Sequence, residues 1–209
     1  MIIQGTPEWY AARLGHCTAS RIADVTARTK TGYGASRATY MWQLIAERLT
    51  GVPQEGYTNA AMQWGLDNEA AARAAYAFRM DVEITEVGYI PHPRIAMSGA
   101  SPDGFVLDYG LVEIKCPLSA THGETLLSET VPDKYVKQMQ YQMACTNRGW
   151  CDYISFDPRL PEAMALFVKR VKRDDVVIAE LEKEVRAFLA ELDGKVASLE
   201  KKFGRRRAA

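Results

Sequence analysis

The sequence predicts one domain of mixed α/β structure, an α+β arrangement with a central mixed sheet flanked by helices. Apolar residues recur at helical spacing toward both ends of the chain, whereas the middle holds short alternating segments bounded by glycine and proline. The segments follow the order helices, strands, helix, strands, helix, without an internal repeat or a linker. We therefore expect residues 1–209 to form a single domain.

The N-terminal part is predicted to be mainly helical. Residues 1–22 should form short helices or turns, and the glycine-rich stretch 29–36 should be a mobile loop. Helical spacing of apolar residues predicts a helix over 40–49, which Gly51 is suited to end. An alanine-rich helix is expected to follow, from about Asn59 to Phe78.

Strands are predicted at residues 82–90, 96–98, 104–107, 111–116, 150–156 and 165–172. A short helix is expected after Pro117, and a longer one over 132–146, where a proline suits the first helical turn. The final helix, Asp174–Phe203, carries apolar residues at steps of three and four, which predicts an amphipathic helix packed on the core.

The composition is that of an ordinary globular protein, with 47% hydrophobic and 25% charged residues. The balance of 26 basic and 26 acidic residues argues against a protein that coats nucleic acid through bulk charge, but it does not exclude a local basic groove. The tail KKFGRRRAA is locally basic and would contact phosphate or be solvated surface. No apolar run approaches the ~20 residues of a membrane span, and we expect no membrane association.

The cysteines form no Cys-x-x-Cys pair, which disfavours a zinc site and a disulfide framework. Free thiols in a reducing compartment are expected instead. Since the N-terminus also lacks the pattern of a secretory signal, the sequence predicts a cytoplasmic protein.

A metal-dependent phosphodiesterase site is predicted in SPDGFVLDYGLVEIK, from Asp103, Glu113 and Lys115. Side chains alternate along a strand, so Glu113 and Lys115 share one face while Ile114 points to the other. Charges on an otherwise apolar strand destabilise it unless a metal ion or a partner charge compensates. The two carboxylates and the backbone carbonyl of Ile114 are oxygen ligands of the kind Mg²⁺ prefers, and Lys115 can hold the attacking water or the phosphate.

Each of these residues also has a simpler interpretation. Asp103 suits a Pro-Asp-Gly turn, and Glu113 with Lys115 would then be a solvated strand face. Glu69 is a candidate second acid from the preceding helix, or a solvated helix glutamate. Arg13 is shaped to bind a terminal phosphate with two parallel hydrogen bonds, or it is a surface arginine.

Several short sequence segments, taken in their order along the chain, help to decide between these interpretations. They are EWYAARLGHCTAS, AAMQWGLDNEAAAR, SGASPDG, LVEIKCP and YVKQMQYQM, followed by a strand that ends in FDPR. Over nearly its whole length the chain resembles the lambda-type phage recombination exonucleases, the YqaJ viral recombinase family. The resemblance implies a restriction-endonuclease-like core. It also implies an Mg²⁺-dependent exonuclease that degrades the 5′-ended strand of linear duplex DNA and leaves 3′ overhangs.

The resemblance assigns roles to individual residues. The implied catalytic residues are Lys115, Glu113, Asp103, Glu69 and Gln138, and the implied metal ligands are Asp103, Glu113 and the carbonyl of Ile114. The implied substrate-binding residues are Arg13, Ser20, Ser101, Arg28, Lys30, Met62 and Gln140. Among these, Arg13 would grip a 5′-phosphate with the two serines as co-donors. Either Arg28 or Lys30 matches a basic loop residue near the DNA. Met62 matches an apolar wedge that separates the strands, with an ordinary core methionine as the alternative.

The resemblance also implies cofactors and partners. Two Mg²⁺ ions are expected, for which Mn²⁺ can substitute, together with linear duplex DNA that ends in a 5′-phosphate. A ring-shaped homotrimer and a single-strand annealing protein are the implied protein partners. Two other functions stay open: a restriction-type endonuclease, for which we find no base-reading segment, and a non-catalytic DNA-end-binding protein.

Overall fold

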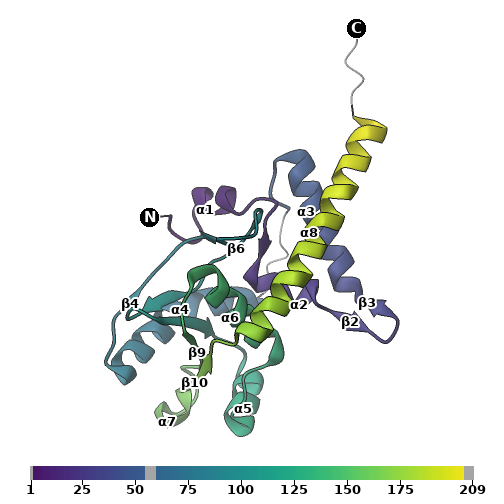
Figure 1. The fold of residues 1–209 in the computed structure, drawn as a ribbon. Coiled ribbons are helices and arrows are strands. Elements are labelled where there is room, and N and C mark those ends of the chain that lie inside the picture. The colour runs from purple at the N-terminus through teal and green to yellow at the C-terminus, as the bar shows by residue number, and fades with distance from the viewer. Residues whose placement is uncertain (1, 55–59, 205–209) are drawn as a thin grey trace.

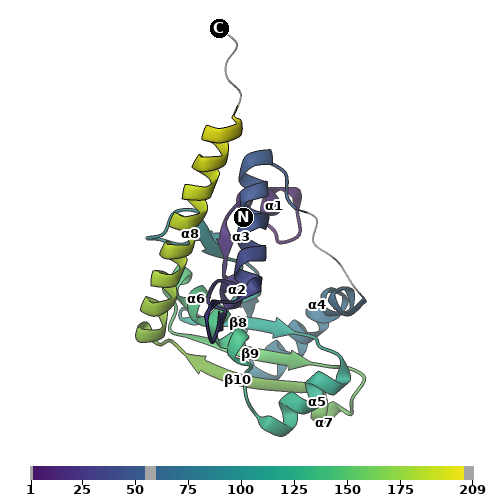
Figure 2. The ribbon, with the colours of Figure 1, turned by 90° about the vertical axis from the view of Figure 1, so that its right-hand side faces the viewer.

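A five-stranded mixed sheet lies at the centre of the computed structural model, which describes residues 2–54 and 60–204. Its strands, in spatial order, are β10 (Leu166–Lys172), β9 (Trp150–Phe156), β8 (Gly110–Lys115), β7 (Gly104–Val106) and β4 (Ile84–Thr85). Strands β8 and β9 are parallel, and the other neighbours are antiparallel. The carboxyl ends of β8 and β9 therefore lie at one edge of the sheet (Figure 2). The predicted mixed sheet flanked by helices is confirmed.

Helices cover both faces of this sheet (Figure 1). Leu111 of β8 packs with Met139 and Met143 of α6 (Asp133–Thr146) on one face. Its neighbours Val112 and Ile114 pack on the opposite face against α4 (Ala60–Met80). Because strand side chains alternate, the odd-numbered residues of β8 all point toward α6.

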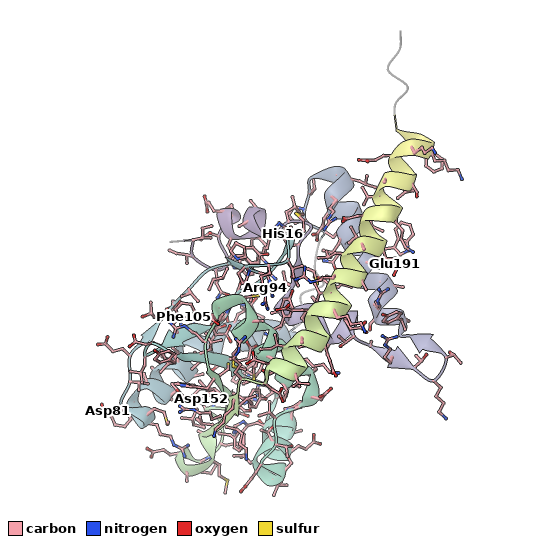
Figure 3. The ribbon with its side chains drawn as sticks, in the orientation of Figure 1. His16, Asp81, Arg94, Phe105, Asp152 and Glu191 are labelled. Carbon is pink, nitrogen blue, oxygen red and sulfur yellow. The ribbon has the colours of Figure 1, made fainter. Side chains whose placement is uncertain are left out.

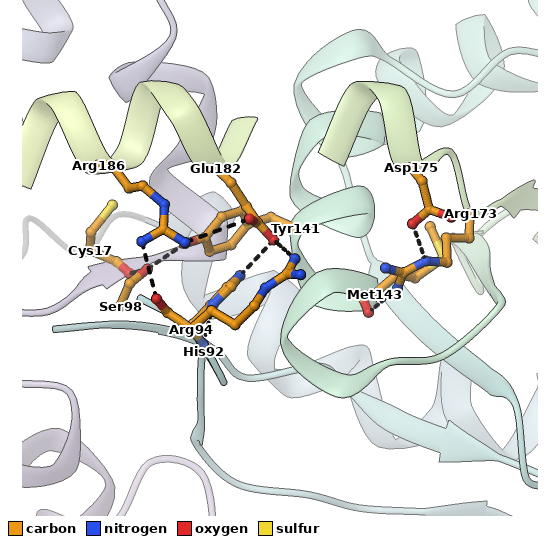
Figure 4. A network of polar contacts seen from close by, with 10 residues as sticks. All are labelled: Cys17, His92, Arg94, Ser98, Tyr141, Met143, Arg173, Asp175, Glu182 and Arg186. Atoms are coloured by element: carbon orange, nitrogen blue, oxygen red, sulfur yellow. Dashed lines mark hydrogen bonds and ion pairs between the residues drawn. The ribbon is translucent and has the colours of Figure 1, made fainter. Parts of the chain in front are cut away.

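A second, three-stranded sheet joins the N-terminal segment to the centre. It consists of β1 (Cys17–Thr18), β6 (Ser98–Ala100) and β5 (Ile90–Pro91), with β1 parallel to β6. Short helices flank β1 in the sequence: α1 (Pro7–Ala12), the 3₁₀ helix η1 (Ala19–Arg21) and α2 (Ile22–Val25). The Ser98 hydroxyl donates to the Cys17 carbonyl at 2.8 Å and hydrogen-bonds the Tyr141 hydroxyl of α6 at 2.6 Å (Figure 4). These bonds fix the N-terminal segment against α6.

The long helix α8 (Asp175–Phe203) runs alongside α3 (Ala35–Thr50) (Figures 1 and 2). Tyr40 of α3 stacks on Phe188 with 5.6 Å between ring centroids, and Arg37 pairs with Glu191, labelled in Figure 3, at 2.7 Å. Nearer the N-terminus of α8, Glu182 accepts a hydrogen bond from Arg94 at 2.5 Å (Figure 4). The predicted helices over 40–49 and 174–203 are thus confirmed, and Gly51 ends the first with a left-handed φ of 69°.

Two predictions about local structure are wrong. The stretch 29–36 is not a loop throughout, because β2 (Arg28–Thr29) and β3 (Gly32–Tyr33) form a hairpin. Its Arg28 and Tyr33 side chains both bind Glu184 of α8, at 2.6 and 2.8 Å, and this tertiary contact orders it. The predicted strand 82–90 is divided between two sheets as β4 and β5. Gly88, between them, packs directly on the Ile2 backbone, where a side chain would not fit.

The remaining helices, α5 (Ser119–Ser128) and α7 (Glu162–Ala165), follow β8 and β9; only α5 is predicted by the sequence. The helices predicted at 59–78 and 132–146 are present as α4 and α6, although Asn59 itself and residues 205–209 of the basic tail lie outside the described residues. All four cysteines are buried free thiols. Among the described residues, no helix has the length and apolarity needed to cross a membrane.

Asp157, which follows β9, connects three elements. It is fully buried and accepts hydrogen bonds from Ser119 at the start of α5 at 2.6 Å and from the Arg159 guanidinium at 2.8 and 2.9 Å. That guanidinium lies 4.0 Å above the ring of Trp64 on α4. Asp157 therefore ties the end of β9 to both α4 and α5.

The hydrogen bonds from Arg159 hold the pKa of Asp157 well below its ordinary value. A carboxyl whose pKa is depressed on folding stabilises the fold fully above its unfolded pKa of about 3.9. This contribution declines as the pH falls below that value and is lost once the pH has passed through the lower folded pKa. We expect Asp157→Asn to lower the free energy of unfolding at pH 7 by about 2 kcal/mol. Urea unfolding at pH 7 and pH 3 tests this, since the difference from the unmodified protein should shrink at the lower pH. A difference independent of pH would contradict it.

Candidate active site

One cavity of about 170 Å³ brings together most of the residues that the sequence singles out. The predicted site residues that line it are Asp103, Glu113, Lys115, Gln138, Arg13, Ser20 and Ser101. They come from β8, the turn before β7, α6 and the N-terminal segment, so the site forms only when the N-terminal segment docks on α6.

Glu113 is the most constrained of these side chains. It is 0% exposed, and it points toward α6, as the alternation along β8 predicts. One oxygen pairs with the Lys115 ammonium and accepts from Gln138 Nε2 at 2.7 Å. The other accepts from Gln142 Nε2 at 2.6 Å. Because the side chain is held at both oxygens, its carboxylate is pre-oriented toward the cavity.

Asp103 completes an acidic pair with Glu113. Its Oδ2 accepts the Ile114 N–H at 2.6 Å, and since the N–H and C=O of one strand residue point to the same side, the Ile114 carbonyl faces Asp103 as well. Burial raises the pKa of Asp103 well above its ordinary value, and the nearby Glu113 carboxylate raises it further. A bound cation would relieve this repulsion.

These three oxygen donors fit the hard divalent cation that the sequence predicts. No cluster of three or more His, Cys, Asp or Glu side chains suited to a metal ion occurs in residues 2–54 and 60–204. The proposed ligand set does not require such a cluster, because it consists of two carboxylates and a main-chain carbonyl.

Lys115 lies between the acidic pair and an aromatic wall. Burial alone would lower the pKa of its ammonium, but the Glu113 and Asp103 carboxylates raise it above the ordinary value. The ammonium also lies 5.3 Å from the Tyr135 ring centroid, close enough for a cation–π interaction. Lys115 is therefore positively charged at the point where a phosphate would meet the carboxylates.

Gln142 is a site residue that our sequence reasoning missed, whereas Gln140 does not reach the site. On a helix, residues two apart point in different directions and residues four apart share a face. Gln142 therefore joins Gln138 at the cavity, while Gln140 donates to the Lys172 carbonyl at 2.8 Å and accepts from the Asp174 N–H at 2.9 Å. The i, i+4 spacing from Gln138 is the signal that would have found Gln142.

Gln142→Leu should impair catalysis as well as folding, because it frees one oxygen of Glu113 and leaves it buried without a donor. We expect the free energy of unfolding to fall by about 1–3 kcal/mol and kcat per folded molecule to fall several-fold. Gln140→Leu on the same helix is the matched control, with a comparable loss of stability and unchanged kcat. Denaturant unfolding and active-site-normalised rates distinguish them. Equal effects of the two variants on kcat would contradict a role of Gln142 in holding Glu113.

Arg13 borders the cavity on the side of the N-terminal segment. Its guanidinium stacks on Trp9 at 3.9 Å, an arrangement that leaves the N–H edges free to bind an anion. The Trp9 indole N–H in turn donates to Ser101 Oγ at 2.9 Å. Burial lowers the pKa of Arg13 from its ordinary value. Because the ordinary pKa of arginine lies far above 7, the guanidinium still stays charged at neutral pH. Trp9 is a second residue that the sequence reasoning left without a role.

A larger cavity, of about 770 Å³, adjoins the first and shares Ser20, Lys115 and Gln138 with it. Glu69 lines this cavity and accepts from Arg73 at 2.7 Å. Its charge also raises the pKa of Asp103, so the two acids lie near one another. Met62 lines the same cavity and is 53% exposed, which excludes the ordinary core methionine that was the alternative.

The structure does not bring Arg28 or Lys30 to either cavity. Arg28 pairs with Glu184 on the β2–β3 hairpin, and Lys30 is exposed in the turn of that hairpin. The site therefore contains every predicted catalytic and metal-binding residue, together with Arg13, Ser20, Ser101 and Met62 of the substrate-binding set.

Comparison with known proteins places this site in a family context. A family model described as "YqaJ-like viral recombinase domain" matches residues 8–149. Among solved structures, an alkaline exonuclease (LHK-Exo) from Laribacter hongkongensis is 54% identical and has a TM-score of 0.88, covering 94% of this chain and 97% of that one. The same exonuclease in complex with dAMP gives 53% identity and a TM-score of 0.90, with the same coverage.

A phage-related exonuclease from Haemophilus somnus 129PT shares the fold. It is 12% identical, with a TM-score of 0.70, and covers 88% of this chain and 96% of that one. None of the curated proteins compared matches the sequence significantly.

Proposed function

This chain belongs to the YqaJ-like viral recombinase family, and from that premise we propose that it is a DNA exonuclease that hydrolyses one strand of linear duplex DNA from its 5′ end and leaves 3′ overhangs. Its likeness to an alkaline exonuclease over 94% of the chain supports the exonuclease activity. The observation that carries the polarity is the position of Arg13 in the same cavity as Asp103, Glu113 and Lys115.

We further propose Mg²⁺ as the cofactor, with two ions, and Mn²⁺ as a substitute. Asp103, Glu113 and the carbonyl of Ile114 would hold the cation, which supplies a nucleophilic water and neutralises charge on the phosphate. Lys115 would contact the scissile phosphate or hold the water, and Gln138 keeps Glu113 in place. Arg13, with Ser20 and Ser101 beside it, would bind the 5′-terminal phosphate.

The alternatives fit the site less well. A non-catalytic DNA-end-binding protein gains nothing from a buried carboxylate pair, because it repels phosphate unless a cation is bound. A restriction-type endonuclease would need a surface that reads base edges. It would also have no use for an arginine placed to grip a strand end.

The proposal is tested with linear duplexes that carry a label at the 5′ or the 3′ end of one strand. A 5′-to-3′ exonuclease releases the 5′ label first as a mononucleotide, in the presence of Mg²⁺ and not of EDTA. Release of the 3′ label first would overturn the polarity. Cutting of closed circular DNA would overturn the exonuclease activity.

A homotrimer that encircles DNA and a single-strand annealing partner are part of the same proposal, and the family resemblance supports both. Mass measurement in solution tests the trimer, and a monomer would contradict encirclement.

A further inference from the structure

A third cavity, of about 300 Å³, lies beyond Arg13 on the side away from the acidic pair. It shares Trp9, Arg13, Thr18 and Ser20 with the catalytic cavity, but Asp103, Glu113 and Lys115 do not line it. These four residues, Arg13 among them, therefore lie at the boundary between the two cavities. A 5′-terminal phosphate bound at Arg13 would lie at the mouth of this cavity, which the removal of a single nucleotide from a blunt end does not use.

The walls of this cavity suit a nucleotide. Its volume is at the lower end of the range of small-ligand sites. Tyr10 lines it and packs edge-to-face with Trp9, with 4.9 Å between ring centroids. Since Tyr10 is still 51% exposed, part of its ring is accessible to a base. Tyr40 forms part of the wall, and His16, labelled in Figure 3, lies nearby on the same wall.

The charges in the cavity favour a phosphate. Besides Arg13, Arg21 lines it, with its guanidinium 4.4 Å above the Tyr40 ring. The Arg21 Nε pairs with Asp24 at 2.6 Å and one Nη donates to Gln43 at 3.3 Å, so the other Nη is left for a ligand. Among the described residues, Glu47 is the one acid in the wall, and both of its oxygens already accept hydrogen bonds, from the Gly15 N–H at 2.9 Å and from Gln43 at 3.2 Å. A second phosphate thus meets Arg13, the guanidinium of Arg21 that it would share with Asp24, and an acid whose oxygens are occupied.

We propose that this cavity binds one unpaired nucleotide on the 5′ side of the phosphate held by Arg13, with Arg21 reaching its terminal phosphate. The inference rests on the proposed function. At an end with a one-nucleotide 5′ overhang, Arg13 then holds the first phosphodiester, and the bond that is cut lies one nucleotide further in. Water adds to phosphorus, the P–O3′ bond breaks, and the leaving 3′-oxygen takes up a proton. The first product is a 5′-phosphorylated dinucleotide, and the shortened strand keeps a 5′-phosphate.

The test compares a 5′-phosphorylated blunt duplex with one that carries a single-nucleotide 5′ overhang, and identifies the first product by chromatography. The unmodified protein should release a mononucleotide from the blunt end and a dinucleotide from the overhang. Arg21→Gln should slow dinucleotide release about tenfold, as expected for the loss of a charged hydrogen bond, and leave the blunt-end rate within about twofold. Gln54→Trp, which fills the cavity from its rim, should have the same selective effect.

Arg79→Gln is the matched control, because Arg79 lies on α4 and donates to the Leu166 carbonyl outside the three cavities. A mononucleotide as the first product from the overhang, or equal slowing of both ends by Arg21→Gln and Gln54→Trp, would overturn the inference and leave the proposed function intact. Failure of the unmodified protein to digest the blunt end would instead overturn the proposed function.

Discussion

Lys115→Ala is expected to abolish digestion of linear DNA, with kcat lower by at least about 10²–10³-fold, the cost of removing one preorganised charge from a developing anion. Lys115 is the cation that pairs with Glu113 in the catalytic cavity. Its removal takes away positive charge where the phosphate meets two carboxylates. The measurement is a single-turnover rate at saturating enzyme, which reports the chemical step without the binding step.

Binding should survive this substitution. Glu113 keeps its bonds from Gln138 and Gln142, so the site should stay assembled, and a gel-shift titration should give a dissociation constant within a few-fold of the unmodified protein. Lys134→Ala is the matched control, because Lys134 is exposed on α6 beside the same Tyr135 ring and should leave the rate unchanged. A Lys115→Ala variant that still cuts DNA at a tenth of the normal rate would remove Lys115 from the mechanism.

Much of this site can be predicted from the periodicity of side chains along single strands and helices, which depends only on residues close in the sequence. The alternation along β8 correctly predicts that Glu113 and Lys115 share a face and that Ile114 packs on the other side. The helical spacing that predicts α3 and α8 is equally local, since each helix buries one stripe against the other.

What periodicity missed depends on long-range contacts. The predicted strand 82–90 is split because its two ends pair with different partners, β7 and β6, and nothing within nine residues specifies those partners. The hairpin at Arg28 is ordered by Glu184 from the far end of the chain. Gln140 was a different kind of error, because helix geometry alone places it on another face from Gln138.

Arg13→Ala is expected to remove the preference for a 5′-phosphorylated end. Arg13 lines the catalytic cavity, and the stacking of its guanidinium on Trp9 fixes the plane in which it presents its N–H groups. Loss of a charged, bidentate hydrogen bond costs about 1.5–3 kcal/mol, so digestion of a phosphorylated end should slow about 10- to 100-fold. The rate on an end with a 5′-hydroxyl should not change.

Arg13→Lys separates geometry from charge. Lysine keeps the positive charge but loses the planar pair of donors, so its preference for the phosphate should lie between those of the unmodified protein and Arg13→Ala. Arg79→Ala, which removes an arginine outside the cavities, should keep the full preference. If Arg13→Ala slows phosphorylated and hydroxyl ends by the same factor, then Arg13 supports the fold or general DNA binding. The 5′ polarity would then lose the one residue that motivates it.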